Sequence, residues 1–194
     1  MTEALRLGND GVQRCWWCGD DPLYVEYHDT EWGKPVHGDQ EMFERLVLEA
    51  FQSGLSWITI LRRREGFRSA FSNFDPHEVA RFGYKERNRL LADTGIIRNA
   101  AKIDATIHNA GIVADMMDRE PGALDDLIWS HAPKTGRNPI RVAADIPAIT
   151  PESEALARSL KKLGFKFVGA TTAYAHMQAV GVVNDHIEGC AFQK

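Results

Sequence analysis

Apolar residues recur along most of this chain at the spacing of an α-helix, and this periodicity constrains the fold more than any other feature. The clearest stretch lies between Asp39, which can cap a helix, and Gly54, which can end it. Its apolar residues stand at i, i+3, i+4, i+7 and i+8: Met42, Phe43, Leu46, Val47 and Ala50. A helix with one apolar face buries that face against other helices, so the pattern predicts an all-α fold.

Capping and stop signals mark several further helices. We predict that they begin at Ser56 and Asp75, span 85–93 and 99–117, and run from Thr150 to Gly164 and from Thr171 or Thr172 to Gly181. Only 140–143 and 165–168 look like strands. The chain has eight prolines, and four of them fall between His131 and Pro151, which indicates a long irregular connection there. We therefore expect a single compact bundle of about eight short helices.

Length and composition limit the class of protein. A chain of 194 residues corresponds to about one domain, and its 44% apolar residues suffice for a core. No apolar run exceeds four residues, far too short for a membrane span. The first residues lack the basic and apolar regions of a secretory signal, so we expect a cytoplasmic protein. In that reducing environment its three cysteines would be metal ligands or free thiols.

Charge is distributed unevenly. The net charge is −4, yet residues 62–102 contain ten basic and five acidic groups, a local excess of 10 − 5 = +5. Such a segment can bind phosphate, although a solvated helix face has the same composition.

Sulfur and imidazole ligands stand at both ends of the chain. His186 and Cys190 are four residues apart in a helix that we expect Asn184 to open, so both can reach one ion. Near the N-terminus, three further candidates are Cys15, Cys18 and His28. A tetrahedral structural zinc site could join the two ends of the chain. Spacing alone leaves open whether Cys15 pairs with Cys18 or with His28, and unrelated thiols and histidines are the ordinary alternative.

Residues 90–98 run from one predicted helix through a turn at Gly95 to the start of another. Amides at a helix start bind phosphate, and Arg98 and Lys102 add positive charge beside them. This is the pattern of a helix-hairpin-helix, which holds the DNA backbone without reading its sequence. A glycine that merely ends a helix is the alternative.

Six Trp and Tyr residues crowd around a single acid. They are Trp16, Trp17, Tyr24, Tyr27, Trp32 and Trp57. Glu49 lies on or beside the apolar face of its helix, where it could pair with Arg45 at the boundary of the core. It could instead be the hydrogen-bond acceptor of an aromatic cage that binds a flat, cationic ligand such as an alkylated purine.

Taken together, these segments closely resemble the bacterial DNA-3-methyladenine glycosylase I family. The resemblance extends from Arg14 to Cys190, through Asp21-Pro22-Leu23-Tyr24, Tyr27-His28-Asp29, Glu31-Trp32-Gly33, Leu48-Glu49, Gly54-Leu55-Ser56-Trp57, Phe74-Asp75, Gly95-Ile96-Ile97-Arg98, Gly164-Phe165-Lys166-Phe167-Val168-Gly169 and Asn184-Asp185-His186. It implies one helical domain, 14–194, of the helix-hairpin-helix DNA glycosylase type, with a structural zinc ion that joins the termini. Residues 1–13 would be an extension.

The resemblance also implies roles for particular residues. It assigns the zinc ion to Cys15, His28, His186 and Cys190 and leaves Cys18 free. Glu49 would hydrogen-bond the flipped base, with Tyr27 and Trp57 stacking on it and Trp17 and Tyr24 lining the pocket. The residues expected to contact DNA are Gly54 and Leu55, a plausible wedge, together with Gly95, Ile97, Arg98 and Lys102. Ala50 follows Glu49 where Gly is common in the family, a change that removes no polar group.

The expected reaction is hydrolysis of the N-glycosidic bond of 3-methyladenine in alkylated double-stranded DNA. It would release the free base and leave an abasic site without strand cleavage, since no lysine Schiff base is implied. We expect a monomer. Two other classes are considered: a zinc-stapled DNA-binding module without catalysis, and a zinc hydrolase that uses Glu188.

Overall fold

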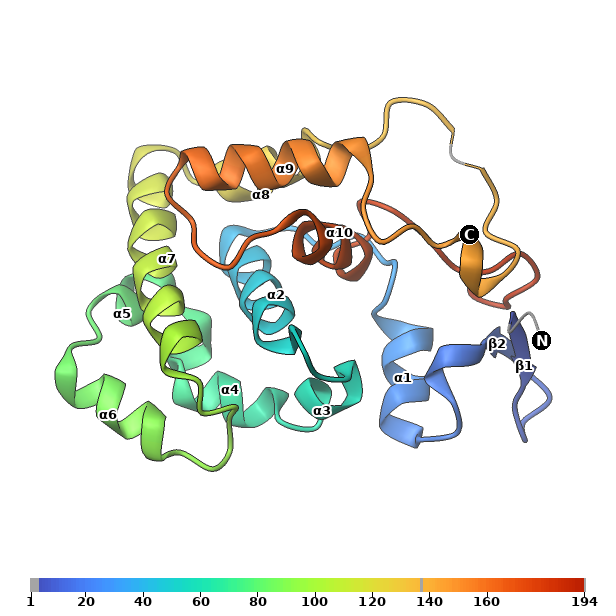
Figure 1. Ribbon diagram of the computed structural model, residues 1–194, viewed down its shortest axis with the longest axis horizontal. Coiled ribbons are helices and arrows are strands. Elements are labelled where there is room, and N and C mark those ends of the chain that lie inside the picture. The colour runs from blue at the N-terminus through green and yellow to red at the C-terminus, as the bar shows by residue number, and fades with distance from the viewer. Residues whose placement is uncertain (1–3, 137, 194) are drawn as a thin grey trace.

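A computed structural model describes residues 4–136 and 138–193. Within these ranges the chain forms ten α-helices and one two-stranded antiparallel sheet (Figure 1). The α-helices are α1 (Pro22–Thr30), α2 (Asp39–Gln52), α3 (Trp57–Leu61), α4 (Arg64–Ala70), α5 (Pro76–Ala80), α6 (Tyr84–Ala92), α7 (Ala100–Arg119), α8 (Ala123–Trp129), α9 (Pro151–Lys162) and α10 (Ala170–Ala179). The strands are β1 (Leu5–Leu7) and β2 (Gln13–Cys15), and short 3-10 helices are η1 (Trp16–Cys18), η2 (Ser72–Phe74) and η3 (Ala143–Asp145). The predicted helical class is confirmed.

Capping residues determine where several helices begin. The Asp75 carboxylate accepts hydrogen bonds from the amides of His77 and Glu78 at the start of α5. Asn99 caps α7 and Thr150 caps α9 in the same way, as predicted. Helix α1 was not predicted, although Asp21 and Pro22 repeat the Asp-Pro signal of α5.

Asp39 caps a different helix from the one expected. Gly38 is the N-cap of α2, and the buried Asp39 carboxylate accepts hydrogen bonds from the amides of Gly122, Leu124 and Asp125 at the start of α8. A side chain from the start of α2 therefore satisfies the free amides of a helix some 80 residues later in the chain.

The two segments that resembled strands are not strands. Residues 140–143 lead into η3, and residues 165–168 connect α9 to α10. The Asn109 side chain of α7 forms two hydrogen bonds to the backbone of Lys166, at 2.9 and 3.0 Å. This amide supplies partners that a neighbouring strand would otherwise supply.

Helix α2 lies in the centre of the bundle, in contact with α7, α8, α10 and α3 (Figure 1). Its inward face and the surrounding helices form the main core, to which five fully buried phenylalanines contribute: Phe43, Phe51, Phe67, Phe71 and Phe74. A second, smaller cluster contains Cys15, Tyr27, Trp32 and Cys190. Trp57 packs against both clusters and therefore lies at their junction.

The two ends of the described chain meet beside the sheet (Figure 1). Strand β1 pairs with β2 with Leu5 opposite Cys15, and the Ala191 amide donates a hydrogen bond to the Gln13 carbonyl. None of the described helices combines the length and the hydrophobicity that crossing a bilayer would require.

Candidate active site and metal centre

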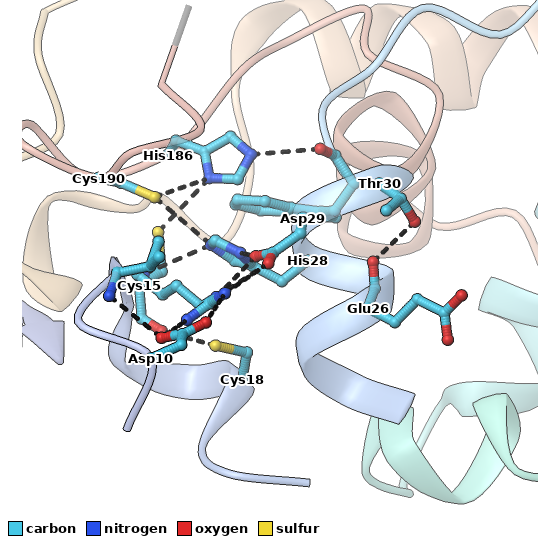
Figure 2. A network of polar contacts seen from close by, with 12 residues as sticks. Asp10, Cys15, Cys18, Glu26, His28, Asp29, Thr30, His186 and Cys190 are labelled. Carbon is cyan, nitrogen blue, oxygen red and sulfur yellow. Dashed lines mark hydrogen bonds and ion pairs between the residues drawn. The ribbon is translucent and has the colours of Figure 1, made fainter. Parts of the chain in front are cut away.

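Four buried side chains from both ends of the chain converge on one point (Figure 2). They are Cys15, His28, His186 and Cys190, and their ligand atoms all lie within 4.8 Å of one another. The Cys190 sulfur is 3.6 Å from His28 Nε2 and 3.5 Å from His186 Nδ1, and the Cys15 sulfur is 3.6 Å from His186 Nδ1. The group joins the four residues that the sequence resemblance had selected as ligands.

This geometry fits a tetrahedral zinc ion. Bonds of about 2.3 Å to sulfur and about 2.0 Å to nitrogen place neighbouring sulfur and nitrogen ligands roughly 3.5 Å apart at a tetrahedral angle. The second nitrogen of each imidazole is also held by an oxygen, as is usual for metal-bound histidine. His186 Nε2 lies 3.2 Å from the Trp32 carbonyl oxygen, and His28 Nδ1 lies 2.8 Å from the Asp29 carboxylate.

A chain of polar contacts continues outward from His28 to the loop that precedes β2 (Figure 2). Arg14 donates to Asp29 at 2.8 Å and to Asp10 at 2.7 Å, and its side chain is almost fully buried. Hydrogen bonds from Arg14 lower the pKa of Asp10 to about 2. Asp10 and Asp29 therefore hold Arg14 between them, and Asp29 in turn orients His28.

Cys18 is not part of the ligand group. Its thiol donates to the Cys15 carbonyl at 3.2 Å, and burial raises its pKa to about 11, so it remains a neutral thiol. The helix expected from Asn184 is absent, because residues 184–190 form turns and irregular backbone. His186 and Cys190 are nevertheless brought together by these turns.

A cavity of about 250 Å³ lies beside the metal centre. Residues from α1, α2, α3, α10 and the segments around them line it: Trp16, Trp17, Tyr24, Tyr27, Trp32, Glu49, Gln52, Trp57, Ile146, Ala175 and Gln178. We call it the aromatic pocket. Tyr27 and Trp57 lie at the same wall, with ring centroids 5.4 Å apart, so the predicted pocket residues are brought together.

Glu49 carries the only carboxylate among the residues that line this pocket. Its side chain is 5% exposed, and no described residue forms a hydrogen bond or a close ion pair with it. Burial raises the pKa of Glu49 to about 8, although the Arg45 charge opposes this shift. The boundary pairing with Arg45 does not form, because Arg45 lies 3.6 Å from Glu31 instead.

The neighbouring phenols are neutral. Burial and, to a smaller extent, the Glu49 charge raise the pKa of Tyr27 well above its usual value. Burial likewise raises the pKa of Tyr24 to about 12. The pocket thus combines flat aromatic walls with one carboxyl group whose hydrogen-bonding capacity is unused, an arrangement that suits a flat ligand with N–H groups and positive charge.

The candidate metal ligands contact the wall of the aromatic pocket. The Trp17 ring lies 5.2 Å from His28, and the Trp32 ring lies 4.7 Å from His186, measured between centroids. Trp17 and Trp32 also contact each other at 4.9 Å. Two of the four candidate ligands therefore position two of the aromatic residues of the pocket.

A second hollow adjoins the pocket and shares Glu49, Gln52 and Ala175 with it. Its outer rim is the loop of residues 53–55, which we call the Gly54 loop. Gly54 has a φ of +85°, which glycine adopts without strain, and the following Leu55 is 41% exposed. The exposed Leu55 thus lines the hollow that adjoins the aromatic pocket.

The turn between α6 and α7, residues 93–98, packs against α4; we call it the Gly95 hairpin. A Cβ atom on Gly66 would lie 2.5 Å from the Gly95 carbonyl oxygen, so the two backbones approach closely. The Gly95 amide donates to the Asp93 carboxylate at 2.7 Å and is therefore already satisfied. Ile97 is half-buried, whereas Arg98 is exposed and has no ion-pair partner among the described residues.

Lys102 does not face solvent, in contrast to the expected phosphate contact. It is 8% exposed, and its ammonium group donates to the carbonyls of Phe51 and Ser53 at 3.0 and 2.9 Å. Burial lowers its pKa. The two acceptors lie about 50 residues earlier in the chain, so the pattern around Lys102 did not indicate them.

Half of the ten basic residues in segment 62–102 form ion pairs within the protein. Five of its arginines form ion pairs: Arg62 with Asp21, Arg64 with Glu31, Arg68 with Glu44, Arg81 with Glu78, and Arg87 with Asp104. The local excess of positive charge is therefore smaller at the surface than the sequence indicated, and Arg98 is left as an exposed cation at the Gly95 hairpin.

Sequence reasoning missed several residues that line the pocket. Ala175 and Gln178 are three apart on α10, a spacing that puts them on one face, but nothing marked that face as a pocket wall. Ile146 comes from the irregular connection, which gave no signal at all. Glu188, weighed as a hydrolase base, pairs with Arg141 at 3.0 Å and is not in the ligand group.

Comparison with known proteins gives consistent matches over most of the chain. The profile of the methyladenine glycosylase family matches residues 17–194. The chain is 45% identical to DNA-3-methyladenine glycosylase 1 of Escherichia coli (strain K12) over 183 residues, which cover 92% of this chain and 96% of that protein.

Two solved structures have the same fold. A crystal structure of 3-methyladenine DNA glycosylase I superposes with a TM-score of 0.87 and 46% identity, covering 92% of this chain and 98% of the other. A variant of 3-methyladenine DNA glycosylase I in complex with 3-methyladenine superposes with a TM-score of 0.86 and 28% identity, covering 93% and 97%.

Proposed function

Because this chain belongs to the methyladenine glycosylase family and is an enzyme of that family, we propose that it excises 3-methyladenine from alkylated double-stranded DNA. Hydrolysis of the N-glycosidic bond releases the free base and leaves an abasic site in an uncut strand. The observation that carries this proposal is the buried Glu49 carboxyl group, which has no hydrogen-bond partner among the described residues and faces an aromatic pocket.

The chemistry of the damaged base explains why a pocket with a single carboxyl group suffices for excision. Alkylation at N3 puts positive charge on adenine while it is still attached to the sugar, so the base is already a good leaving group. Glu49 accepts hydrogen bonds from the extruded base, and its carboxylate favours the cation over a neutral base. Tyr27 and Trp57 add stacking, which is stronger for a cationic ring system.

The base must leave the duplex before it can enter the pocket. Extrusion costs a few kcal/mol, and contacts to the DNA backbone together with a wedge in the vacated stack must offset this cost. Leu55, exposed at the rim of the hollow beside Glu49, is the wedge, and Gly54 allows the sharp turn that presents it. Arg98, exposed on a helix-hairpin-helix that also includes Gly95 and Ile97, binds phosphate.

We also propose that Cys15, His28, His186 and Cys190 hold one structural zinc ion, since their spacing and the oxygen partners of both imidazoles fit tetrahedral coordination. When bound, zinc supplies a cross-link between the ends of the chain. The protein residues around it hold Trp17 and Trp32 in place. We expect the protein to act as a monomer.

Release of free base from methylated duplex DNA tests the proposal. The purified protein is incubated with DNA methylated by a simple alkylating agent, and the released bases are separated by chromatography. We expect 3-methyladenine in solution and strands that break only after alkaline treatment, which cleaves at abasic sites. Binding of the DNA without base release would instead indicate a DNA-binding module. Strand breaks before alkali would contradict the proposed uncut product.

A further inference from the structure

Lys102 is the one lysine that the structure describes as buried, and its contacts are not those of a surface residue. Its ammonium group donates two hydrogen bonds, to the carbonyl oxygens of Phe51 at 3.0 Å and Ser53 at 2.9 Å. These carbonyls belong to the C-terminal end of α2, where backbone acceptors lack partners within the helix. A positive charge is favourable there because the helix dipole is negative at this end.

The two carbonyls lie between the two groups that would act on the flipped base, Glu49 and Leu55. Phe51 is two residues after Glu49, and Ser53 is the first residue of the Gly54 loop, which carries Leu55. A hydrogen bond from the Leu55 amide to the Gln52 carbonyl, at 2.6 Å, closes the turn between them. Lys102 therefore holds the backbone at the start of the bend that leads from Glu49 to the exposed Leu55.

Lys102 itself stands directly after the Gly95 hairpin. The Asn99 side chain accepts a hydrogen bond from the Lys102 amide at 3.1 Å, and Arg98 precedes that cap by one residue. In the next turn of α7, the Thr106 hydroxyl donates to the Lys102 carbonyl. One residue thus connects the hairpin that is proposed to hold the DNA backbone with the loop that is proposed to enter the base stack.

From this geometry we infer that Lys102 is a positioning residue for base extrusion. It fixes the position of the Gly54 loop relative to the Gly95 hairpin when the protein is bound to DNA. It does not contact phosphate, and it acts through the loop. This inference rests on the proposed glycosylase function, and it adds that Lys102 connects the Gly54 loop to the Gly95 hairpin. An ordinary helix-capping lysine would stabilise the protein without any selective effect on duplex DNA.

The test compares Lys102→Met, which keeps the aliphatic stem, with the wild type and with Lys161→Met, an exposed lysine of α9. Because a wedge is needed only where the base is stacked in a duplex, we expect Lys102→Met to lower excision from duplex DNA about 10-fold or more. Excision from single-stranded DNA and the affinity for free 3-methyladenine should change about 2-fold or less. Lys161→Met should match the wild type in all three.

Salt dependence distinguishes positioning from phosphate contact. The logarithm of the DNA-binding constant falls with the logarithm of the salt concentration, and each phosphate contact contributes about one unit to the slope. The slope should therefore be the same for Lys102→Met and wild type. A slope reduced by about one unit would overturn the inference and return Lys102 to the phosphate-binding residues.

A double-mutant cycle with Leu55→Ala provides a second test. If Lys102 acts through the Gly54 loop, Lys102→Met should cost little further duplex activity once Leu55 is truncated. Lys102→Arg, which keeps a cation with several donors, should recover most of the activity. Additive losses, or equal losses on duplex and single-stranded DNA, would overturn the inference. Lack of excision by the wild type in the same assay would contradict the proposed function instead.

Discussion

At the scale of single residues, burial of the Glu49 carboxyl group destabilises the fold but provides an acceptor for the ligand. Its carboxyl group is buried among aromatic rings, without a hydrogen-bond partner among the residues that the structure describes. Burial raises its pKa to about 8, so the empty pocket favours the neutral acid at neutral pH. A cationic base would reverse this preference, because opposite charge stabilises the carboxylate.

The first prediction concerns Glu49→Gln. The amide keeps an acceptor oxygen but cannot provide the negative charge that favours a cation, so we expect slower base release with unchanged DNA affinity. Glu44→Gln, on the same helix but paired with Arg68 instead of facing the pocket, is the matched control. Single-turnover excision measures both. Full activity of Glu49→Gln would remove Glu49 from the mechanism.

The second prediction concerns the pH dependence of stability. Between the ordinary Glu pKa of 4.5 and the raised pKa of about 8, the folded protein keeps a proton on Glu49 that the unfolded chain releases. The unfolded state then binds fewer protons, so this residue makes the free energy of unfolding fall as pH rises through that window. Glu49→Gln lacks the titration. Its stability relative to wild type should therefore rise from pH 5 to pH 9.

Each unit of pKa shift corresponds to about 1.4 kcal/mol, so the gain is a few kcal/mol at most. Urea unfolding of both proteins at pH 5, 7 and 9 measures it. Parallel stability curves for Glu49→Gln and wild type would show that Glu49 has an ordinary pKa in the folded protein.

At the scale of structural elements, the Gly95 hairpin differs from the hairpin of β1 and β2, which we call the N-terminal hairpin, in which charged groups are left without a partner. In the Gly95 hairpin the glycine amide is bound by Asp93, and Arg98 is the exposed cation. In the segment that joins β1 to β2, by contrast, Asp10 is engaged with the nearly buried Arg14. Under the proposed function, we therefore expect the Gly95 hairpin to bind phosphate through Arg98, and Asp10 to hold the residues that orient the candidate ligand His28.

The third prediction tests the Gly95 hairpin. Arg98→Ala should weaken binding to all duplex sequences alike and reduce the salt slope by about one unit, since one phosphate contact is lost. Arg81→Ala, in which the arginine is exposed but paired with Glu78, is the control and should leave the slope unchanged. Titrations at several salt concentrations measure both slopes. Equal slopes for both variants would show that Arg98 is an ordinary solvated side chain.

The fourth prediction tests the N-terminal hairpin. Asp10→Asn weakens the charge that holds Arg14, which orients Asp29 and, through it, His28. We expect a chelator to remove the metal about 2- to 10-fold faster, a smaller effect than loss of a direct partner of a ligand. Asp20→Asn, which breaks an exposed pair with Arg6, is the control. Equal rates of metal loss in both variants would disprove the connection.

At the scale of the whole molecule, the four candidate metal ligands join the two ends of the described chain and contact the pocket wall. Closing so long a loop removes much of the conformational freedom of the unfolded chain. Because Trp17 and Trp32 pack on the ligands His28 and His186, loss of the ion should also disturb the aromatic wall. Stability and base binding are therefore coupled through this site.

The fifth prediction follows from that coupling. Cys190→Ser should lose the zinc ion, lower the melting temperature and weaken binding of free 3-methyladenine. Cys18→Ser should keep one zinc ion per chain, since Cys18 only donates to the Cys15 carbonyl. Elemental analysis, thermal melting and ligand titration on the two variants measure these effects. Loss of zinc in Cys18→Ser but not in His28→Ala would show that the ligand set is wrong.

The sequence by itself determined the helical class, the position of several helices and the kinds of residue in the site, although it did not indicate α1 or α8. Periodicity located α2 and α7, and Asp75, Asn99 and Thr150 marked the starts of their helices, because these signals depend on neighbours within one or two turns. Five candidate metal ligands and the aromatic residues around Glu49 were also recognisable from their types and order along the chain, and the family resemblance reduced the ligands to four.

Only the tertiary structure decided which partners distant residues take. Asp39 caps α8 instead of α2, Lys102 reaches the end of α2 instead of solvent, and Ile146 joins the pocket from an irregular segment. The reason is physical: a buried charge or polar group must find a partner, and packing of the whole chain sets which group lies within about 3 Å of it. Local patterns contain no information about that distance.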